Sequence, residues 1–217
     1  MTVWRELGRD TTRLFSPIGF LPIDDVTQQL AGLPIAVALD VRDAGRWVAL
    51  QVRAVAAPSG TLIFPALERR ARPSLHSPRH YRVRLTTDHY VPDYRQTTDG
   101  VDFDSYPYDD ASPPQVVVRQ PLTLPLYPSA AYPFAGGTRV LRGRILDVNQ
   151  NAVADAGVTV DAHDKSVTNS KGEFAVVLRY ARNTTVPVDV SHQRSGRANT
   201  INITLPDALG QGLTVPL

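Results

Sequence analysis

The chain has 217 residues and a formal net charge of +2, so its overall charge does not indicate a nucleic-acid partner. Apolar residues make up 42% of it, enough for one large or two small cores, and its 18 Pro and 14 Gly favour turns over long helices. The lack of cysteine excludes disulfides and thiolate metal sites. No apolar run approaches the ~20 residues that span a bilayer. Because charges stand near the start, we expect synthesis in the cytoplasm without a signal peptide.

Residues 1–34 are predicted to form an N-terminal arm. Apolar side chains occur there without the period-two alternation of a strand. Two interpretations stay open, since the arm either packs across its own domain or docks on a neighbouring subunit. The apolar residues are Trp4, Leu7, Leu14, Phe15, Ile18 and Phe20.

Residues 35–120 are predicted to form a first β-sandwich. Val37, Leu39 and Val41 share one face of a strand, whereas Asp40 and Arg42 point to the other. The same alternation returns after the turn at 43–46 and again over 81–85. Strands with one buried and one wet face are typical of antiparallel sheets.

Residues 121–137 are predicted to be a Pro-rich linker, because Pro lacks the backbone donor that a central strand needs. Gly136 and Gly137 mark the boundary to a second domain, residues 138–217. At least five short alternating segments follow, separated by turns about every ten residues, which is the pattern of a second sandwich. The predicted fold class is therefore all-β, with two small sandwiches, an arm and a connection.

The second domain resembles the carboxypeptidase regulatory-like family, whose fold is an Ig-like or transthyretin-like β-sandwich. The resemblance covers about 75 residues. It departs at Gln150 and Asp155, where Gly is usual, at Ala152 for Pro and at Asn169 for Asp. It implies a fold but only an accessory role. The matching positions are Gly143, Ile145, Asp147, Val153, Ala156, Val158, Thr168, Gly172 and Phe174.

The whole chain resembles small accessory proteins of contractile phage tails and phage-tail-like injection systems. The resemblance lies in the domain order and in the Leu-Pro-Leu-Tyr-Pro connection at residues 124–128. It implies a non-enzymatic structural subunit of a baseplate or tail, present in several copies within a virion or injection particle. It implies protein partners, and neither a cofactor, nor a nucleic acid, nor membrane insertion.

Three groups of polar residues are candidate sites. Acidic residues at 99–110 offer the oxygen ligands that calcium prefers, although the spacing of an EF-hand is missing, so a solvated loop is expected and cation binding stays open. His76 and His80 lack a third metal ligand. The basic residues between 69 and 84 are expected to be a solvated face or to meet an acidic protein. The sequence therefore assigns no catalytic, cofactor-binding or metal residue.

Aromatic and apolar residues of the arm and linker are the predicted protein interface, since extended Pro-rich segments suit packing along a partner. A rival hypothesis is a carbohydrate- or peptide-binding accessory module. That module needs exposed aromatic residues in one group, for which Tyr90, Tyr94, Tyr106 and Tyr108 are candidates. The predicted interface residues are Trp4, Leu14, Phe15, Phe20, Tyr127, Tyr132 and Phe134.

Overall fold

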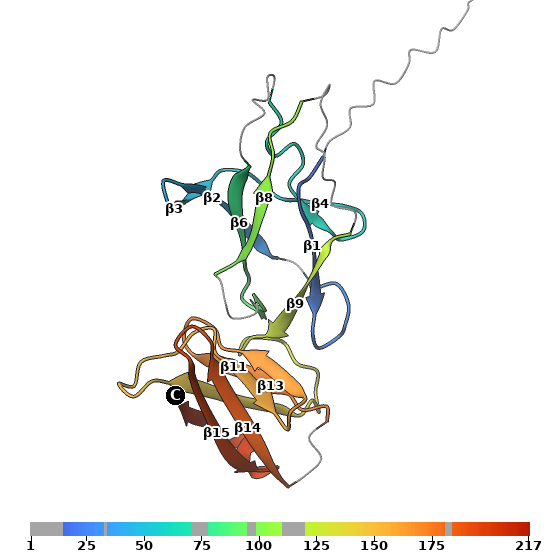
Figure 1. Ribbon diagram of the computed structural model, residues 1–217. Coiled ribbons are helices and arrows are strands. Elements are labelled where there is room, and N and C mark those ends of the chain that lie inside the picture. The colour runs from blue at the N-terminus through green and yellow to red at the C-terminus, as the bar shows by residue number, and fades with distance from the viewer. Residues whose placement is uncertain (1–14, 33, 71–77, 95–98, 110–119, 181–183) are drawn as a thin grey trace, which may run out of the picture.

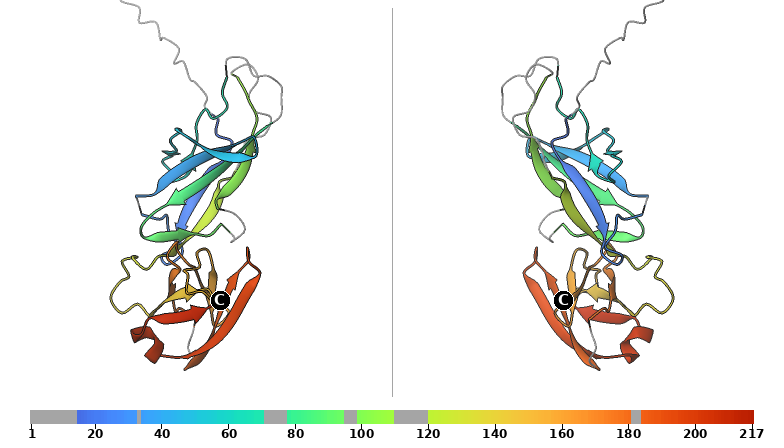
Figure 2. Two further views of the ribbon diagram at one scale, coloured as in Figure 1. Left: turned by 90° about the vertical axis from the view of Figure 1, so that its left-hand side faces the viewer. Right: turned by 90° about the vertical axis from the view of Figure 1, so that its right-hand side faces the viewer.

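A computed structural model describes residues 15–32, 34–70, 78–94, 99–109, 120–180 and 184–217. Over these ranges the chain forms two β-sandwiches stacked end to end (Figures 1 and 2), which confirms the predicted all-β fold class. The first sandwich contains β1 (Gly19–Asp24), β2 (Ala36–Asp43), β3 (Arg46–Leu50), β4 (Val55–Ala56), β5 (Leu62–Ile63), β6 (Arg79–Thr86), β7 (Tyr90–Pro92), β8 (Val101–Ser105) and β9 (Leu122–Pro128). The second contains β10 (Val140–Leu146), β11 (Gly157–Val160), β12 (Asp164–Val167), β13 (Glu173–Val177), β14 (Thr185–His192), β15 (Arg197–Thr204), the short helix α1 (Asp207–Gly210) and β16 (Leu213–Pro216).

The N-terminal sandwich packs two sheets face to face, with strand orders β4-β5-β1-β9-β7 and β3-β2-β6-β8. Alternation places Leu39 and Val41 of β2 inside, and register pairs them with Val83 and Tyr81 of β6. Phe20 of β1 fills the centre of the same core. Burying such side chains supplies most of the driving force for this domain.

Strands β1 and β9 are the main departure from the sequence prediction. Segment 19–24 was expected in an arm and 122–128 in a linker, yet the two strands pair in parallel, with Phe20 opposite Leu122. Their pairing partners lie about a hundred residues apart, so no local pattern reveals that both complete one sheet. The N-terminal sandwich consequently begins at β1 and ends at β9.

The proline residues of these strands lack a backbone donor, but their carbonyl groups still accept hydrogen bonds. The Pro22 oxygen accepts from the Ala31 amide at 3.0 Å, and the Pro125 oxygen accepts from the Asp93 amide at 3.0 Å. The general rule that excludes Pro from inner strands concerns the missing donor alone. That rule led to the prediction of a linker where β9 forms.

Two buried carboxylates link strands and loops of the N-terminal sandwich through ion pairs and hydrogen bonds. Asp40 is 2% exposed, and its carboxylate accepts hydrogen bonds from Arg82 and Arg84, at 2.9 Å from each. Burial alone would raise the pKa of Asp40, but the bonds from the two guanidinium groups outweigh it and hold the pKa below its usual value. A second buried carboxylate, Glu68, accepts from the Tyr81 hydroxyl and pairs with Arg79 at 3.1 Å.

The C-terminal sandwich packs a three-stranded sheet, β13-β10-β16, on a four-stranded sheet, β12-β11-β14-β15. Its core cluster is apolar and occupies most of the positions that the period-two pattern predicts. Leu141 and Ile145 of β10 face Val158 of β11 and Val188 of β14, and all four are nearly or fully buried. Phe174 is the largest side chain of this core.

Gly143 in β10 and Thr168 after β12 shape the packing of this second sandwich. A Cβ at Gly143 would lie 2.6 Å from the Phe174 ring, so only Gly lets that ring pack here. The Thr168 hydroxyl donates to the Val153 carbonyl at 2.7 Å and accepts from the Ala156 amide at 2.8 Å. The matching residues therefore act in packing and turn formation.

Candidate protein-interaction surface

The junction between the sandwiches is built around aromatic side chains. Tyr90 and Tyr132 meet edge-on with ring centroids 5.5 Å apart, and Tyr132 lies 4.8 Å from Phe134. The Tyr132 hydroxyl donates to the buried Asp24 carboxylate at 2.7 Å. Burial and that carboxylate raise the pKa of Tyr132, so its hydroxyl stays protonated to a higher pH than that of an exposed tyrosine. The Arg142 guanidinium stacks over Phe134, 5.0 Å from the ring centroid.

Residues 129–138, which connect β9 to β10, are anchored to both domains. The Ser129 hydroxyl donates to the Asp88 carbonyl at 2.6 Å on the N-terminal side. Arg142 of β10 donates to the Ala130 carbonyl at 2.8 Å on the C-terminal side. The connection is thus an ordered turn that fixes the aromatic cluster at the junction.

The predicted interface residues are distributed between the core, the junction and the undescribed start of the chain. Trp4 and Leu14 lie outside the described residues. Phe20 must be corrected, because it is 0% exposed in the core of its own domain and offers no surface to a partner. Phe15 is half-buried and packs edge-on against Tyr108, with ring centroids 5.7 Å apart.

The other three predicted residues lie at the junction, and each is half-buried. Tyr132 and Phe134 belong to the aromatic cluster, whereas Tyr127 of β9 faces the second sandwich. Burial and the nearby Asp93 carboxylate raise the pKa of Tyr127 to about 12. The structure therefore groups these three but separates them from Phe15.

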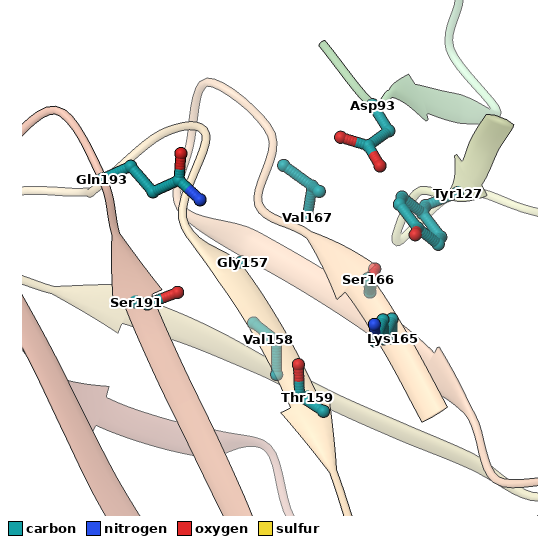
Figure 3. A pocket seen from close by; sticks show the side chains of 10 residues that line it. All are labelled: Asp93, Tyr127, Gly157, Val158, Thr159, Lys165, Ser166, Val167, Ser191 and Gln193. Atoms are coloured by element: carbon teal, nitrogen blue, oxygen red, sulfur yellow. The ribbon is translucent and has the colours of Figure 1, made fainter. Parts of the chain in front are cut away.

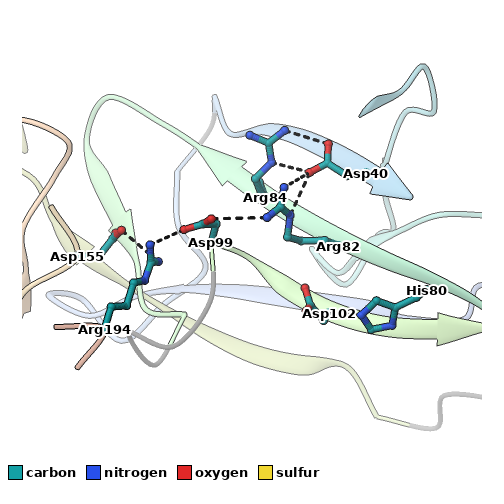
Figure 4. A network of polar contacts seen from close by, with 8 residues as sticks. All are labelled: Asp40, His80, Arg82, Arg84, Asp99, Asp102, Asp155 and Arg194. Carbon is teal, nitrogen blue, oxygen red and sulfur yellow. Dashed lines mark hydrogen bonds and ion pairs between the residues drawn. The ribbon is translucent and has the colours of Figure 1, made fainter. Parts of the chain in front are cut away.

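A line of alternating charges crosses the junction (Figure 4). Arg82 lies between the Asp40 carboxylate at 2.9 Å and Asp99 at 3.6 Å. On the other side of Asp99, Arg194 of the second sandwich approaches at 2.6 Å, and Arg194 also lies 3.3 Å from Asp155. Asp99 and Arg194 are 95 positions apart in the sequence. The acidic residues around Asp99 therefore predicted a loop but not its ion pair with Arg194.

Side chains of the chain's own arginine and histidine residues contact the described part of the acidic segment. Asp104 accepts from the His80 ring at 2.8 Å, and Asp102 lies 3.7 Å from the same ring. Arg82 stacks 4.5 Å over the Trp47 ring, so the basic segment is partly neutralised and packed. Among the described residues, no three His, Asp or Glu side chains converge on a metal position, and His76 lies outside them.

A shallow polar cleft of about 270 Å³ lies where the two sandwiches meet (Figure 3). Asp93 and Tyr127 form its N-terminal wall. Strands β11 and β12 and the end of β14 form the other wall, with Lys165, Ser191 and Gln193 presenting polar groups. The cleft therefore brings hydrogen-bond donors and acceptors close together, with a carboxylate from Asp93 and an ammonium group from Lys165.

Several large apolar side chains are exposed that the sequence did not single out. Val148 is 76% exposed at the turn after β10. Tyr180 must be corrected, because the period-two pattern put it on the face of Phe174, whereas it is 60% exposed beyond β13. Of the four tyrosines proposed for ligand binding, only Tyr106 is exposed, whereas Tyr108 is buried. Alternation failed to find the exposed residues because they lie in turns and at strand ends, where period-two patterns do not apply.

Comparisons with known proteins leave the chain without a family. No family model matches it, and no curated protein matches its sequence. Among solved structures, the crystal structure of BcpA, the major pilin subunit of Bacillus cereus, is similar over 88% of this chain and 67% of that chain, with 7% sequence identity and a TM-score of 0.27. In the ranges that the structure describes, no helix is both long and apolar enough to cross a bilayer.

Proposed function

We propose that the protein is a non-enzymatic structural subunit of a multiprotein assembly. The observation that carries this proposal is the junction, in which aromatic packing, hydrogen bonds and ion pairs hold two sandwiches in one arrangement. Arg179 adds to it by donating to the Asp25 carbonyl at 2.5 Å and pairing with the Asp25 carboxylate at 3.0 Å. A subunit that spaces its neighbours needs such fixed geometry between its domains.

The use of the buried carboxylates also supports a structural role. Asp40 accepts from two arginines, and Asp24 accepts from the hydroxyls of Tyr90 and Tyr132. Asp164 is 1% exposed and accepts from the backbone amides after β13. Each carboxylate therefore ties two segments of the fold together, whereas a catalytic acid or base has to face a substrate.

The specific assembly that we propose is a contractile phage tail or phage-tail-like injection system, with the chain in its baseplate or tail. The support is the domain order, in which a sandwich and a Pro-containing strand precede a regulatory-like sandwich. The carboxypeptidase regulatory-like assignment of residues 138–217 belongs to the same proposal. Its support is the packing of Phe174 on Gly143 and the turn made by Thr168.

The proposed partners are other structural proteins of the particle, and several copies of the chain are expected in each. The proposed contact surface combines the apolar residues at the start of the chain with the half-buried ring of Phe134. Aromatic residues beside an arginine, such as Arg142, are enriched at the centres of protein interfaces.

Co-sedimentation tests this proposal. The chain would be produced together with the genes that flank its own, and particles would be separated on a density gradient and inspected by electron microscopy. We expect the chain to travel with sheathed particles, and Phe134→Ser to lower its occupancy more than the matched surface change Val148→Ser. A chain that stays at the top of the gradient while particles assemble without it contradicts the proposal.

A binding module is the second candidate, and the polar cleft at the junction is the observation that favours it. The cleft combines the Tyr127 ring with the side chains of Asp93 and Gln193, which are groups that bind sugar hydroxyls or peptide amides. Glycan and peptide arrays probed with the full chain test this function. Binding that Gln193→Ala removes and Val148→Ala keeps favours the module.

A further inference from the structure

The line of alternating charges that crosses the junction joins the two sandwiches through exposed side chains. We propose that Asp99, Arg194 and Asp155 form an electrostatic latch that sets the angle between the two sandwiches, and that high ionic strength releases it. The latch continues into the buried Asp40 through Arg82, so its N-terminal end is fixed in the sheet (Figure 4).

Both ends of the latch are positioned by tight backbone. Asp99 precedes Gly100, where a Cβ would lie 2.4 Å from the Val83 carbonyl oxygen, so the loop lies directly against β6. Arg194 lies in the turn between β14 and β15, which closes with the Ser195 amide donating to the His192 carbonyl at 3.1 Å. Arg194 therefore reaches a carboxylate that is already held in place.

Exposure makes the latch sensitive to salt. The side chains of Arg194 and Asp99 are 35% and 57% exposed, so dissolved ions screen their attraction. The second ion pair of the junction, Arg179 with Asp25 at 3.0 Å, is screened in the same way. The aromatic cluster of Tyr132 and Phe134 is packed by contacts that salt does not screen. Releasing the latch would therefore loosen one part of the junction and leave the other in contact.

The connection offers a place for the resulting rotation. Gly136 and Gly137 are exposed, and a Cβ at either position would meet nothing within 4 Å. Gly137 has a φ of +82°, a conformation that glycine adopts freely. Rotation at these residues would change the angle between the sandwiches without breaking strand pairs. The contacts of Arg142 with the Ala130 carbonyl and the Phe134 ring limit how far it can go.

Distance measurements between the domains test the latch. The chain has no cysteine, so Val48→Cys and Val148→Cys introduce one spin label in each sandwich without background labelling. Pulsed electron paramagnetic resonance would then record the distance distribution of the full chain. The samples are the unaltered junction, Arg194→Gln and the control Arg197→Gln, which removes the same charge three residues away.

We expect one narrow distance for the unaltered junction at low salt. For Arg194→Gln we expect the ratio of undocked to docked chains to rise about 2- to 5-fold, since one exposed pair that crosses the junction is lost. The unaltered protein should broaden likewise at about 1 M salt, where the screening length is about 3 Å. Arg197→Gln should match the unaltered junction.

Thermal unfolding of each variant separates a released junction from a damaged fold, and the unfolding temperature is expected to stay unchanged. Identical distributions for Arg194→Gln and the unaltered junction would overturn the latch. So would a narrow distribution that high salt leaves unchanged.

Discussion

The two sandwiches have similar architectures, but the contacts that stabilise each one differ in how far apart in the sequence the contacting residues lie. In the C-terminal sandwich, side chains stabilise turns next to them in the sequence, as when Asn169 accepts from the amides of Lys171 and Glu173 at 2.9 and 3.0 Å. In the N-terminal sandwich, the key contacts are distant, such as the pairing of β1 with β9. The second sandwich also pairs its first and last strands, β10 with β16, so the chain ends of both domains must meet. The difference is one of degree, since the paired strands are about a hundred residues apart in the first domain and 70 in the second, where local turns add further support.

Removal of β9 gives the largest expected difference between the domains. A fragment of residues 1–120 lacks the strand between β1 and β7, so its core stays open and we expect no cooperative unfolding transition. A fragment of residues 138–217 keeps all strands of its sandwich and should unfold cooperatively by itself. Circular dichroism during heating distinguishes them.

A folded 1–120 fragment would contradict the role of β9, and extension to residue 137 is the matched control that should restore folding. A disordered 138–217 fragment would show that the second sandwich depends on the first.

Truncation of the central phenylalanines should have the next largest effect. Phe174→Ala and Phe20→Ala each remove a ring that is at most 1% exposed, and each should lower the free energy of unfolding by about 3–5 kcal/mol. Denaturant titration measures both. A loss below about 1 kcal/mol at either position would show that the ring lies outside the core.

The sequence predicted the fold class and most of the C-terminal sandwich, because buried and exposed residues alternate there and the turns are local. Phe174 illustrates this, since its predicted core position is confirmed by its burial. Phe20 illustrates the opposite case, because its strand has no local period and pairs with a segment rich in proline. The junction was equally hidden, since Asp99 and Arg194 meet only once both domains have folded.

Neutralising the buried carboxylate of the first sandwich should have a smaller effect. Asp40→Asn keeps the size of the side chain but weakens its bonds to Arg82 and Arg84, so a loss of about 1.5–3 kcal/mol in unfolding free energy is expected. Asp189→Asn on the exposed face of β14 is the matched control in the second sandwich. If both variants lost the same unfolding free energy, the ion pairs of Asp40 would not stabilise the first sandwich in the way that we propose.

The loss of stability in acid should depend on the same carboxylate. The folded-state pKa of Asp40 is lowered, so its contribution to stability is present above the unfolded value of 3.8 and is lost as the pH falls through the folded pKa. We therefore expect Asp40→Asn to flatten the acid limb of the stability curve. An unchanged acid limb, measured by denaturant titration across pH, would contradict this assignment.

The smallest expected effect is a loss of stability of the N-terminal sandwich at alkaline pH. Burial raises the pKa of Tyr94 to about 12 and that of Tyr127 to about 12, from the usual value of 10.0. A raised pKa stabilises the fold below pH 10.0, and that contribution is lost as the pH rises towards 12. Ultraviolet absorbance of tyrosinate should therefore rise together with unfolding of the N-terminal sandwich.

Reconstruction of the assembled particle by electron cryo-microscopy tests the proposed structural role most directly. The expected result is a second chain in contact with the residues that precede β1, 1–18, or with the connection 129–135, burying the exposed part of Phe134. Finding both segments packed only on their own subunit, with no other chain within contact range, would contradict the proposed role and favour a free-standing binding module.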